Sequence, residues 1–419
     1  MNTTLYSLPD DVLIYNITFL FVPDILILRQ TCKRFNALTR LSIVWTNAFK
    51  FNILANDYPF SPDYTNIEHR TRSAYRLASR WLADSPLTPQ VETIFIGMPA
   101  YVVKFVPGRQ HKWLLTLSHG SGAALTIWDV TYRQKCSEWP LESAMFTGMT
   151  TNTDTQSEAS VAVSFVGIPF LLRRIALLRL DDNGILHEIH GFDNNLRPVT
   201  LTGDFVALSD DISKIVIYNW KTDESAYLDD GGGLDRNRCL EVVFTPSTIL
   251  VITVSYMNLY IRPSLLHGQT LTPVSSYSFG QAYGASVPTP APNNPLSILI
   301  RSLSTENHDL STSLKLYSLP SFPPILTSHI SYRCRTFQTT GFMLGQRATA
   351  VWIQPNDLGG SQTLVAAVYP GPLNPTAEVR VRNVCSNPLN NWGTLDYDEE
   401  LGRIALGSTS GRGITVVQL

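Results

Sequence analysis

A glycine-flanked triplet near residue 409, Gly407-Ser408-Thr409-Ser410-Gly411, has the outline of a nucleophile elbow with threonine at its centre. Such an elbow holds its nucleophile on a sharp turn between a strand and a helix. Here the flanking sequence, RIALGSTSGRGITVV, has strand character on both sides. Two strands joined by a short Gly- and Ser-rich turn form a hairpin, so we predict a turn and no nucleophile.

Two histidines three residues apart, His187 and His190, would be able to bind zinc if they shared one face of a helix. The surrounding GILHEIHGF has strand character, and strand residues three apart point to opposite faces. The glycine-rich segment Asp229–Asp235 lacks the Lys-Ser/Thr pair that ends a phosphate-binding loop. We therefore predict no metal and no cofactor.

Neighbouring carboxylates, which can perform general acid–base catalysis, occur at Asp181-Asp182, at Asp210-Asp211 and within DYDEE at 396–400. All three sets lie at expected hairpin turns, where Asp is favoured because it hydrogen-bonds its own backbone. No Ser–His–Asp set and no CxxC pair stands out. The sequence therefore predicts a protein that is not an enzyme.

The composition limits the compartment and the partners. The chain has 419 residues and a net charge of −2, with its basic residues scattered, which disfavours nucleic acid or a membrane surface as a partner. Its five cysteines are far apart and odd in number, and no secretory signal precedes them. We expect free thiols in a reducing compartment, cytoplasmic or nuclear.

The long segment Val91–Leu419 consists of short strand-like runs separated by turn residues. Its clearest block contains four expected strands, at about 101–106, 112–118, 123–129 and 134–139. The third ends in Trp128-Asp129, the dipeptide that marks a WD-repeat blade, and weaker copies follow, making about seven units. This segment resembles WD-repeat-like propellers, which implies a β-propeller of about seven blades.

A closed propeller leaves no strand edge free where its first and last blades meet. GITVVQL at the end of the sequence is expected to be only the third strand of its blade, whereas Val91–Gly97 is a strand with no blade of its own. We therefore predict that Thr93–Ile96 runs beside Ile414–Val417 and closes the ring.

The segment Leu5–Leu38 has helical periodicity instead. Pro9 and two aspartates suit the start of one helix, and Pro23-Asp24 breaks the chain and starts another. Its apolar runs are too short to span a bilayer. Further apolar residues lie outside these apolar helix faces, which suggests contact with a protein partner. The alternative is that they pack on the chain's own C-terminal part. These further residues are Ile14, Phe19, Phe21 and Ile27.

This segment resembles an F-box, on a pattern that covers about 40 residues. The matching residues are Leu8-Pro9, Val12-Leu13, Ile17, Leu20, Asp24-Ile25, Leu28, Cys32-Lys33, Phe35 and Leu38, with Thr31 where the family usually has Val. The resemblance implies docking on the Skp-type adaptor of SCF (Skp–cullin–F-box) ubiquitin ligases. It places Leu8, Pro9, Leu28, Cys32 and Phe35 in or near the adaptor interface. The combination with a propeller resembles fungal F-box proteins.

Between these parts, 56–66 is rich in turn residues and 68–83 is an expected helix. Its apolar side carries Ala78 and Trp81 and is expected to anchor it to the next domain, fixing the angle of the F-box. Arg72, Arg76 and Arg80 form a stripe on the other side, either a solvated face or a site for phosphate or acidic protein.

The sequence thus predicts a multidomain α plus all-β protein: an F-box at 1–52, a linker and connecting helix at 53–90 and a propeller at 91–419. The function implied is that of a substrate receptor, in which one propeller rim holds an unidentified target protein. We expect target contacts in the hairpin 166–174, at Ile168, Phe170, Leu171 and Arg173. The alternatives are a non-ligase F-box scaffold and a catalytic propeller, such as a hydrolase or lyase, with titratable groups in its channel. The expected innermost strands, YVVKF, VTLTG and LEVVF, are mostly apolar and count against the catalytic alternative.

Overall fold

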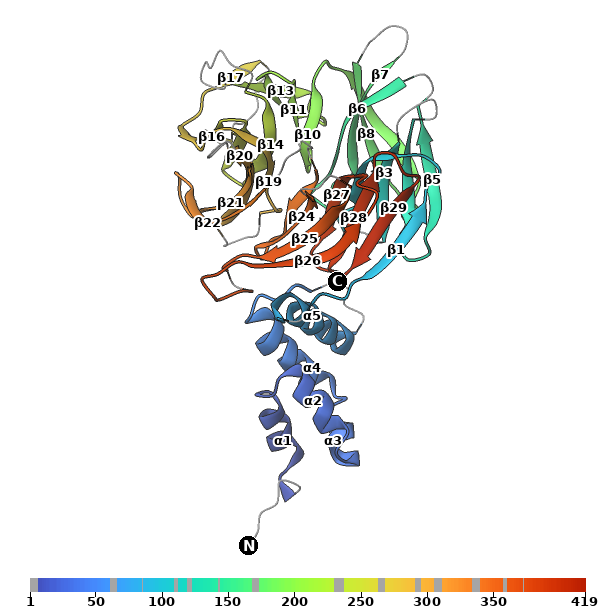
Figure 1. Cartoon of the computed structure of the whole chain (residues 1–419), viewed down its shortest axis with the longest axis vertical. Helices are drawn as coiled ribbons and strands as arrows, with labels where there is room; N and C mark the ends of the chain where they lie inside the picture. The colour runs from blue at the N-terminus through green and yellow to red at the C-terminus, as the bar shows by residue number, and fades with distance from the viewer. Residues whose placement is uncertain are drawn as a thin grey trace.

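A small helical unit, one connecting helix and a large β-propeller follow one another along the chain in the computed structural model (Figure 1). The structure describes residues 7–60, 66–84, 86–108, 112–118, 123–141, 144–167, 173–229, 237–262, 268–290, 295–304, 311–333, 340–356, 360–371 and 373–419. This architecture confirms the predicted fold class, α plus all-β with seven blades. The exact domain boundaries at 52 and 90 stay predictions.

The helical unit contains α1 (Asp10–Ile17), α2 (Val22–Arg29), α3 (Lys33–Leu38), α4 (Ser42–Ala48) and a short π-helix, η2 (Phe49–Leu54). Its core is built around Leu13, Ile25 and Trp45, each at most 2 % exposed. Pro9 precedes α1 and Pro23 lies in the first turn of α2, so both prolines mark helix starts, as predicted.

Seven sheets form the propeller. From the innermost strand outward, the blades are β2–β5, β6–β9, β10–β13, β14–β16 with β18, β19–β22, β23–β26, and β27–β29 with β1. The first four blades contain β2 (Ala100–Phe105), β3 (Trp113–Ser118), β4 (Ala124–Asp129), β5 (Gln134–Pro140), β6 (Ala144–Thr151), β7 (Val161–Gly167), β8 (Arg173–Leu180), β9 (Leu186–Asp193), β10 (Arg197–Thr202), β11 (Phe205–Ser209), β12 (Ile215–Asn219), β13 (Glu224–Leu228), β14 (Cys239–Phe244), β15 (Thr248–Thr253), β16 (Tyr256–Ile261) and β18 (Ser275–Ser278).

The last three blades contain β19 (Ala282–Ser286), β20 (Leu296–Ser304), β21 (Ser311–Leu319), β22 (Ile325–Arg333), β23 (Phe342–Leu344), β24 (Thr349–Pro355), β25 (Gln362–Val368), β26 (Arg380–Asn387), β27 (Trp392–Asp398), β28 (Arg403–Ser408), β29 (Gly413–Gln418) and β1 (Gln90–Phe95). A short strand, β17 (Gln269–Leu271), adds a parallel fifth strand to the outer edge of the third blade.

The second and third strands of each blade form the core because both of their faces are covered, by the sheets on either side. Sequences such as WLLTLS in β3 and TILVIT in β15 are therefore almost continuously buried. In the first blade, the Trp128 indole N–H donates to Thr116 Oγ1 at 2.9 Å, and Asp129 accepts two backbone N–H groups in the following turn. The WD dipeptide thus joins neighbouring strands and ends the third.

The ring closes as the sequence predicts. β1 pairs antiparallel with β29, with Thr93 opposite Thr415 and Ile94 opposite Ile414. The N-terminal strand of the propeller therefore supplies the outer strand of the last blade, and the first and last blades belong to one hydrogen-bonded sheet.

Among the helices of the described residues, none is both long and apolar enough to cross a bilayer. Four cysteines, Cys32, Cys136, Cys239 and Cys385, are free thiols. Cys334 lies outside the described residues.

Candidate partner-binding surfaces

The helical unit exposes an unusual number of large apolar side chains. Nine of them are exposed in its described part: Val12, Tyr15, Phe19, Phe21, Ile27, Leu41, Ile43, Phe51 and Leu54. Large apolar surface on a soluble fold marks sites of contact with another protein. The propeller does not cover these residues, so the alternative in which they pack on the C-terminal part is wrong.

The stripe Val12, Tyr15 and Phe19 is the clearest part of this surface. These residues are spaced i, i+3 and i+7 along α1 and its C-terminal turn, and Tyr15 and Phe19 are 65 % and 69 % exposed. Leu13 and Ile17 on the other side are buried. α1 therefore has two apolar faces, one in the unit's own core and one open.

The five predicted adaptor residues divide into two kinds. Pro9 is exposed, and Leu8, Leu28 and Cys32 are half-buried, so all four can contact a partner. Phe35 is only 9 % exposed and belongs to the core of the unit. Its position in or near the adaptor interface stays a prediction, with a role in supporting the exposed residues from the core.

Two side chains hold the accessible residues in place. Arg34 on α3 donates to the Leu8 carbonyl oxygen at 2.6 Å and pairs with Asp10 at 2.5 Å, which ties the start of α1 to α3. The Cys32 sulfur accepts the Phe35 N–H at 3.5 Å and caps α3. The Leu8-Pro9 turn is therefore held in place by contacts with α3.

Helix α5 (Ile67–Leu82) connects the unit to the propeller. Trp81, Leu77 and Ala78 are buried in one cluster with the strands of the last two blades. At the other end of the helix, Ala74 and Tyr75 pack against η2. The prediction that the apolar side of this helix anchors it to the propeller is confirmed.

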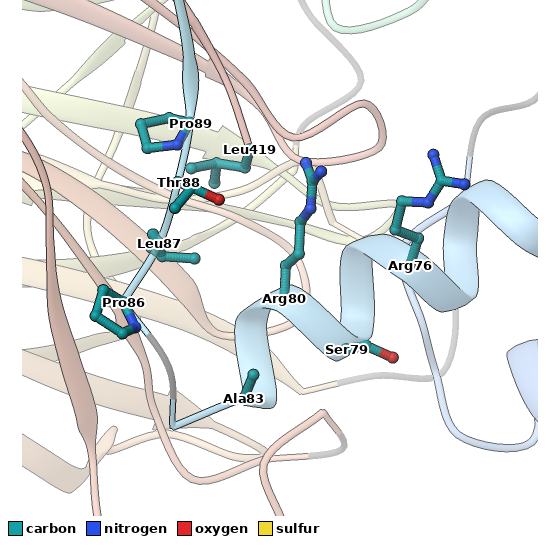
Figure 2. Close-up of a pocket in the computed structure, with 9 residues that line it drawn as sticks. All are labelled: Arg76, Ser79, Arg80, Ala83, Pro86, Leu87, Thr88, Pro89 and Leu419. Carbon is teal, nitrogen blue, oxygen red and sulfur yellow. The ribbon is translucent and has the colours of Figure 1, made fainter. Parts of the chain in front are cut away.

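The arginine stripe of α5 is divided between two environments. Arg72 is neutralised by Glu68 at 3.2 Å on the same helix. Arg76 and Arg80 instead line a pocket with residues 86–89 and Leu419 (Figure 2).

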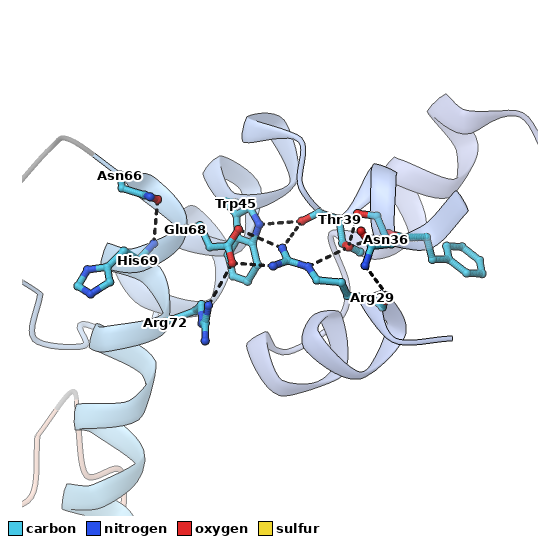
Figure 3. A network of polar contacts seen from close by, with 9 residues as sticks. Arg29, Asn36, Thr39, Trp45, Asn66, Glu68, His69 and Arg72 are labelled. Atoms are coloured by element: carbon cyan, nitrogen blue, oxygen red, sulfur yellow. Dashed lines mark hydrogen bonds and ion pairs between the residues drawn. The ribbon is translucent and has the colours of Figure 1, made fainter. Parts of the chain in front are cut away.

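A polar network joins α5 to the rest of the helical unit (Figure 3). Arg29 on α2 binds both carboxylate oxygens of Glu68, at 2.8 and 3.0 Å, and donates to the Thr39 carbonyl oxygen at 2.6 Å. Its guanidinium lies over the Trp45 ring, and the Trp45 indole N–H donates to the same Thr39 oxygen. Burial alone would raise the pKa of Glu68, but hydrogen bonds and charge from Arg29 and Arg72 lower it. The partly buried, bidentate pair therefore fixes α5 relative to α2.

A second network joins the linker to the propeller. Arg347, in the turn between β23 and β24, is 7 % exposed and pairs with Glu400 at 2.7 Å and Glu399 at 3.5 Å. It also lies 3.7 Å from Asp57 of the linker, while Glu400 accepts the Phe60 N–H at 2.7 Å. The helical unit is thus held at a fixed angle by both apolar and ionic contacts.

The contacts of the linker and α5 show which end of the propeller, or rim, faces the helical unit. The linker and α5 contact turns between first and second strands, such as those at 345–348 and 399–402. In an antiparallel blade, the hairpins between second and third strands lie at the opposite end. The ends of β7 and β8 that flank the hairpin predicted to bind the target therefore lie at the rim far from the helices. Its residues Ile168, Phe170 and Leu171 lie outside the described residues, whereas Arg173 begins β8 and donates to the Asn195 carbonyl oxygen at 2.5 Å.

The innermost strands are less apolar than the sequence suggests. Lys104 Nζ on β2 pairs with Asp396 on β27 at 2.9 Å, and Asp396 also accepts the Phe105 N–H at 2.7 Å. Glu241 on β14 accepts a hydrogen bond from Thr200 on β10 at 2.9 Å. Each carboxylate thus joins the first strands of two neighbouring blades. Both carboxyl groups therefore have structural partners between neighbouring blades.

The glycine-flanked triplet lies in a hairpin, and the histidine pair lies in a strand. Gly407–Gly411 connects β28 to β29 as a hairpin. His187 contacts Asp181, and His190 contacts the Tyr218 hydroxyl. The two rings therefore have different hydrogen-bond partners. No group of three or more His, Cys, Asp or Glu suited to a metal occurs in the described part of the chain.

Glu241 makes the stability of the propeller depend on pH. Burial raises its pKa from 4.5 to about 7, although Thr200 and Lys104 oppose the shift. The folded protein therefore holds this proton more tightly, and the resulting stability is complete below pH 4.5 and is lost as the pH rises through about 7.

Glu241→Gln mimics the protonated carboxyl, so we expect it to remove this part of the pH dependence. Between pH 5.5 and pH 8, the melting temperature of the wild type should fall by about 2–4 °C more than that of the variant, in parallel calorimetric scans. Equal slopes in the two proteins would show that Glu241 does not keep its proton in the fold.

No protein-family model matches the chain, and no curated protein matches its sequence. Among solved structures, the β-propeller domain of Cps50 (Swd1) from Myceliophteria thermophila superposes with a TM-score of 0.55 and 10 % sequence identity. The match covers 78 % of this chain and 99 % of that domain. The chain is therefore similar to this propeller in fold, which agrees with the seven-bladed architecture.

Proposed function

We propose that this protein is a substrate receptor of an SCF-type ubiquitin ligase, in which the helical unit docks on a Skp-type adaptor and the propeller binds the target. The observation that carries the proposal is the open apolar face of α1, next to an accessible Leu8-Pro9 turn, within the segment that resembles an F-box. A protein that binds no partner at this face would gain no stability from exposing Tyr15 and Phe19 to water.

The arrangement of the parts supports the same role. α5 and the two ionic networks hold the helical unit against one rim, which leaves the opposite rim open to a second protein. A receptor that does no chemistry works by proximity, because it raises the effective concentration of a target lysine near the conjugating enzyme. A fixed angle between its two binding parts serves that purpose.

The target-binding surface remains a proposal on the far rim, at Ile168, Phe170, Leu171 and Arg173. A catalytic propeller is less well supported, because its channel carboxylates, Asp396 and Glu241, are already engaged between blades. A non-ligase F-box scaffold would share the adaptor contact. Pull-downs with and without proteasome inhibition separate it from a ligase receptor, since only a receptor's targets should accumulate on the propeller when degradation stops.

Leu8→Ala with Pro9→Ala tests the adaptor contact. Truncating interface anchors typically costs about 1–4 kcal/mol, so the affinity for a purified Skp-type adaptor should fall at least about tenfold in isothermal titration calorimetry. Leu389→Ala, which removes a 73 % exposed leucine from the propeller, is the matched control and should bind like the wild type. Unchanged affinity in the double variant would count against the assignment.

A further inference from the structure

A pocket of about 260 Å³ lies between the last turns of α5, the segment 86–89 and Leu419. Its lining combines apolar surface from Leu87 and Leu419 with the Thr88 hydroxyl, whereas the Ser79 hydroxyl points away from Thr88 (Figure 2). It lies on the rim that carries the helical unit, away from the rim proposed for the target.

Arg76 and Arg80 supply the charge of this pocket. They are one helical turn apart, and their guanidinium groups extend from the same side of α5 (Figure 2). Both side chains are exposed. Within the described ranges, neither guanidinium has a carboxylate partner, in contrast to Arg72 with Glu68. Two like charges at this spacing disfavour the helix slightly unless an anion binds between them.

The surroundings add positive charge and leave little to neutralise it. Arg382 donates to the Arg80 carbonyl oxygen at 2.9 Å, and Arg380 donates to the Leu82 carbonyl oxygen at 2.5 Å. Burial and the neighbouring Arg380 lower the pKa of Arg382. Asp84, which lies 3.7 Å from Arg380, is fully exposed. Four arginines, Arg76, Arg80, Arg380 and Arg382, therefore gather around the end of α5.

We propose that this pocket binds a phosphate group carried on a protein side chain. Two guanidinium forks and the Thr88 hydroxyl can donate to the oxygens of a phosphate, which binds arginine through paired, charge-assisted hydrogen bonds. The apolar lining would contact the stem that carries the phosphate, and this contact favours a phosphorylated residue over free phosphate. The site depends on neither the adaptor contact nor ubiquitin transfer.

The test uses ³¹P NMR titration of the full chain with N-acetyl-O-phosphoserine N-methylamide, and with inorganic phosphate in a separate arm. The wild type should bind the phosphoserine probe saturably and more tightly than inorganic phosphate, and the binding should weaken as NaCl is raised. Arg76→Ala with Arg80→Ala should weaken it by about a hundredfold, tenfold for each lost charged contact. Arg72→Ala, on the same helix but outside the pocket, should bind like the wild type.

Three results would overturn the proposal. These are the absence of saturable binding in the wild type at low salt, equal affinity in the double variant, and inorganic phosphate binding as tightly as the phosphoserine probe. The last would show that the apolar lining contributes nothing and that the stem is not recognised. Because both arginines are exposed, we expect the double variant to keep the wild-type melting temperature. The salt titration of the wild type tests the same claim without any substitution.

Discussion

Deleting residues 412–419 should abolish the cooperative unfolding of the propeller. The deletion removes β29, which pairs with β28 on one side and β1 on the other, and exposes both edges. It also removes Ile414 and Val417, both 0 % exposed, from the core. An open ring with free strand edges is expected to aggregate, so calorimetry should show no sharp transition and light scattering should show large species.

Two point variants in the paired strands β1 and β29 test the same closure without a deletion. Val417 on β29 is opposite Val91 on β1, but Val417 is buried whereas Val91 is 50 % exposed. Val417→Asp places an unpaired charge in the core and should behave like the deletion, whereas Val91→Asp should keep a wild-type transition. A cooperative transition in the deletion variant would mean that closure through β1 and β29 is dispensable.

Trp81→Ala should detach the helical unit from the propeller. The side chain is 2 % exposed and packs in the cluster that α5 shares with the last two blades, with its ring edge-on to Tyr397. Replacing a buried Trp by Ala typically costs about 3–5 kcal/mol. The propeller keeps its own blades, so we expect small-angle X-ray scattering to show a broadened, longer particle and limited proteolysis to cleave near 55–66.

Trp81→Phe is the control for this prediction. The Trp81 indole N–H makes no hydrogen bond to the described residues, so a phenylalanine loses volume but no polar contact. It should keep most of the wild-type scattering profile. If Trp81→Ala scatters like the wild type, the two ionic networks alone fix the angle and the apolar anchor is not needed.

The parts of the fold that are predictable from the sequence are those with strong local signals. The second and third strands of each blade are covered on both faces, so sequences such as WLLTLS and TILVIT form recognisable apolar runs. Closure of the ring was predictable because the last blade had only three expected strands, whereas the strand at 91–97 belonged to no blade. The amphipathic helix α5 had an apolar side wide enough to show its role as an anchor.

The parts that were missed depend on neighbours distant in the chain. The innermost strands give little strand signal, because AYGAS and FML are short and AMFTGMTT contains several small or polar residues. The contacts of Lys104, Glu241 and Asp396 follow from the packing of the first strands of neighbouring blades. The Arg347 network joins residues almost 300 positions apart, and no local pattern encodes it. The F-box-like pattern likewise does not separate core residues from contact residues, so the burial of Phe35 could not be read from it.

Amide hydrogen–deuterium exchange on the full chain, alone and with a purified Skp-type adaptor, tests the central claim most directly. We expect adaptor-dependent protection in α1, α2 and α3, greatest around Leu8-Pro9 and Phe19, with the far rim of the propeller unchanged. Protection confined to the propeller, or no protection at saturating adaptor, would contradict the account of the helical unit as the adaptor-docking part of a ligase receptor.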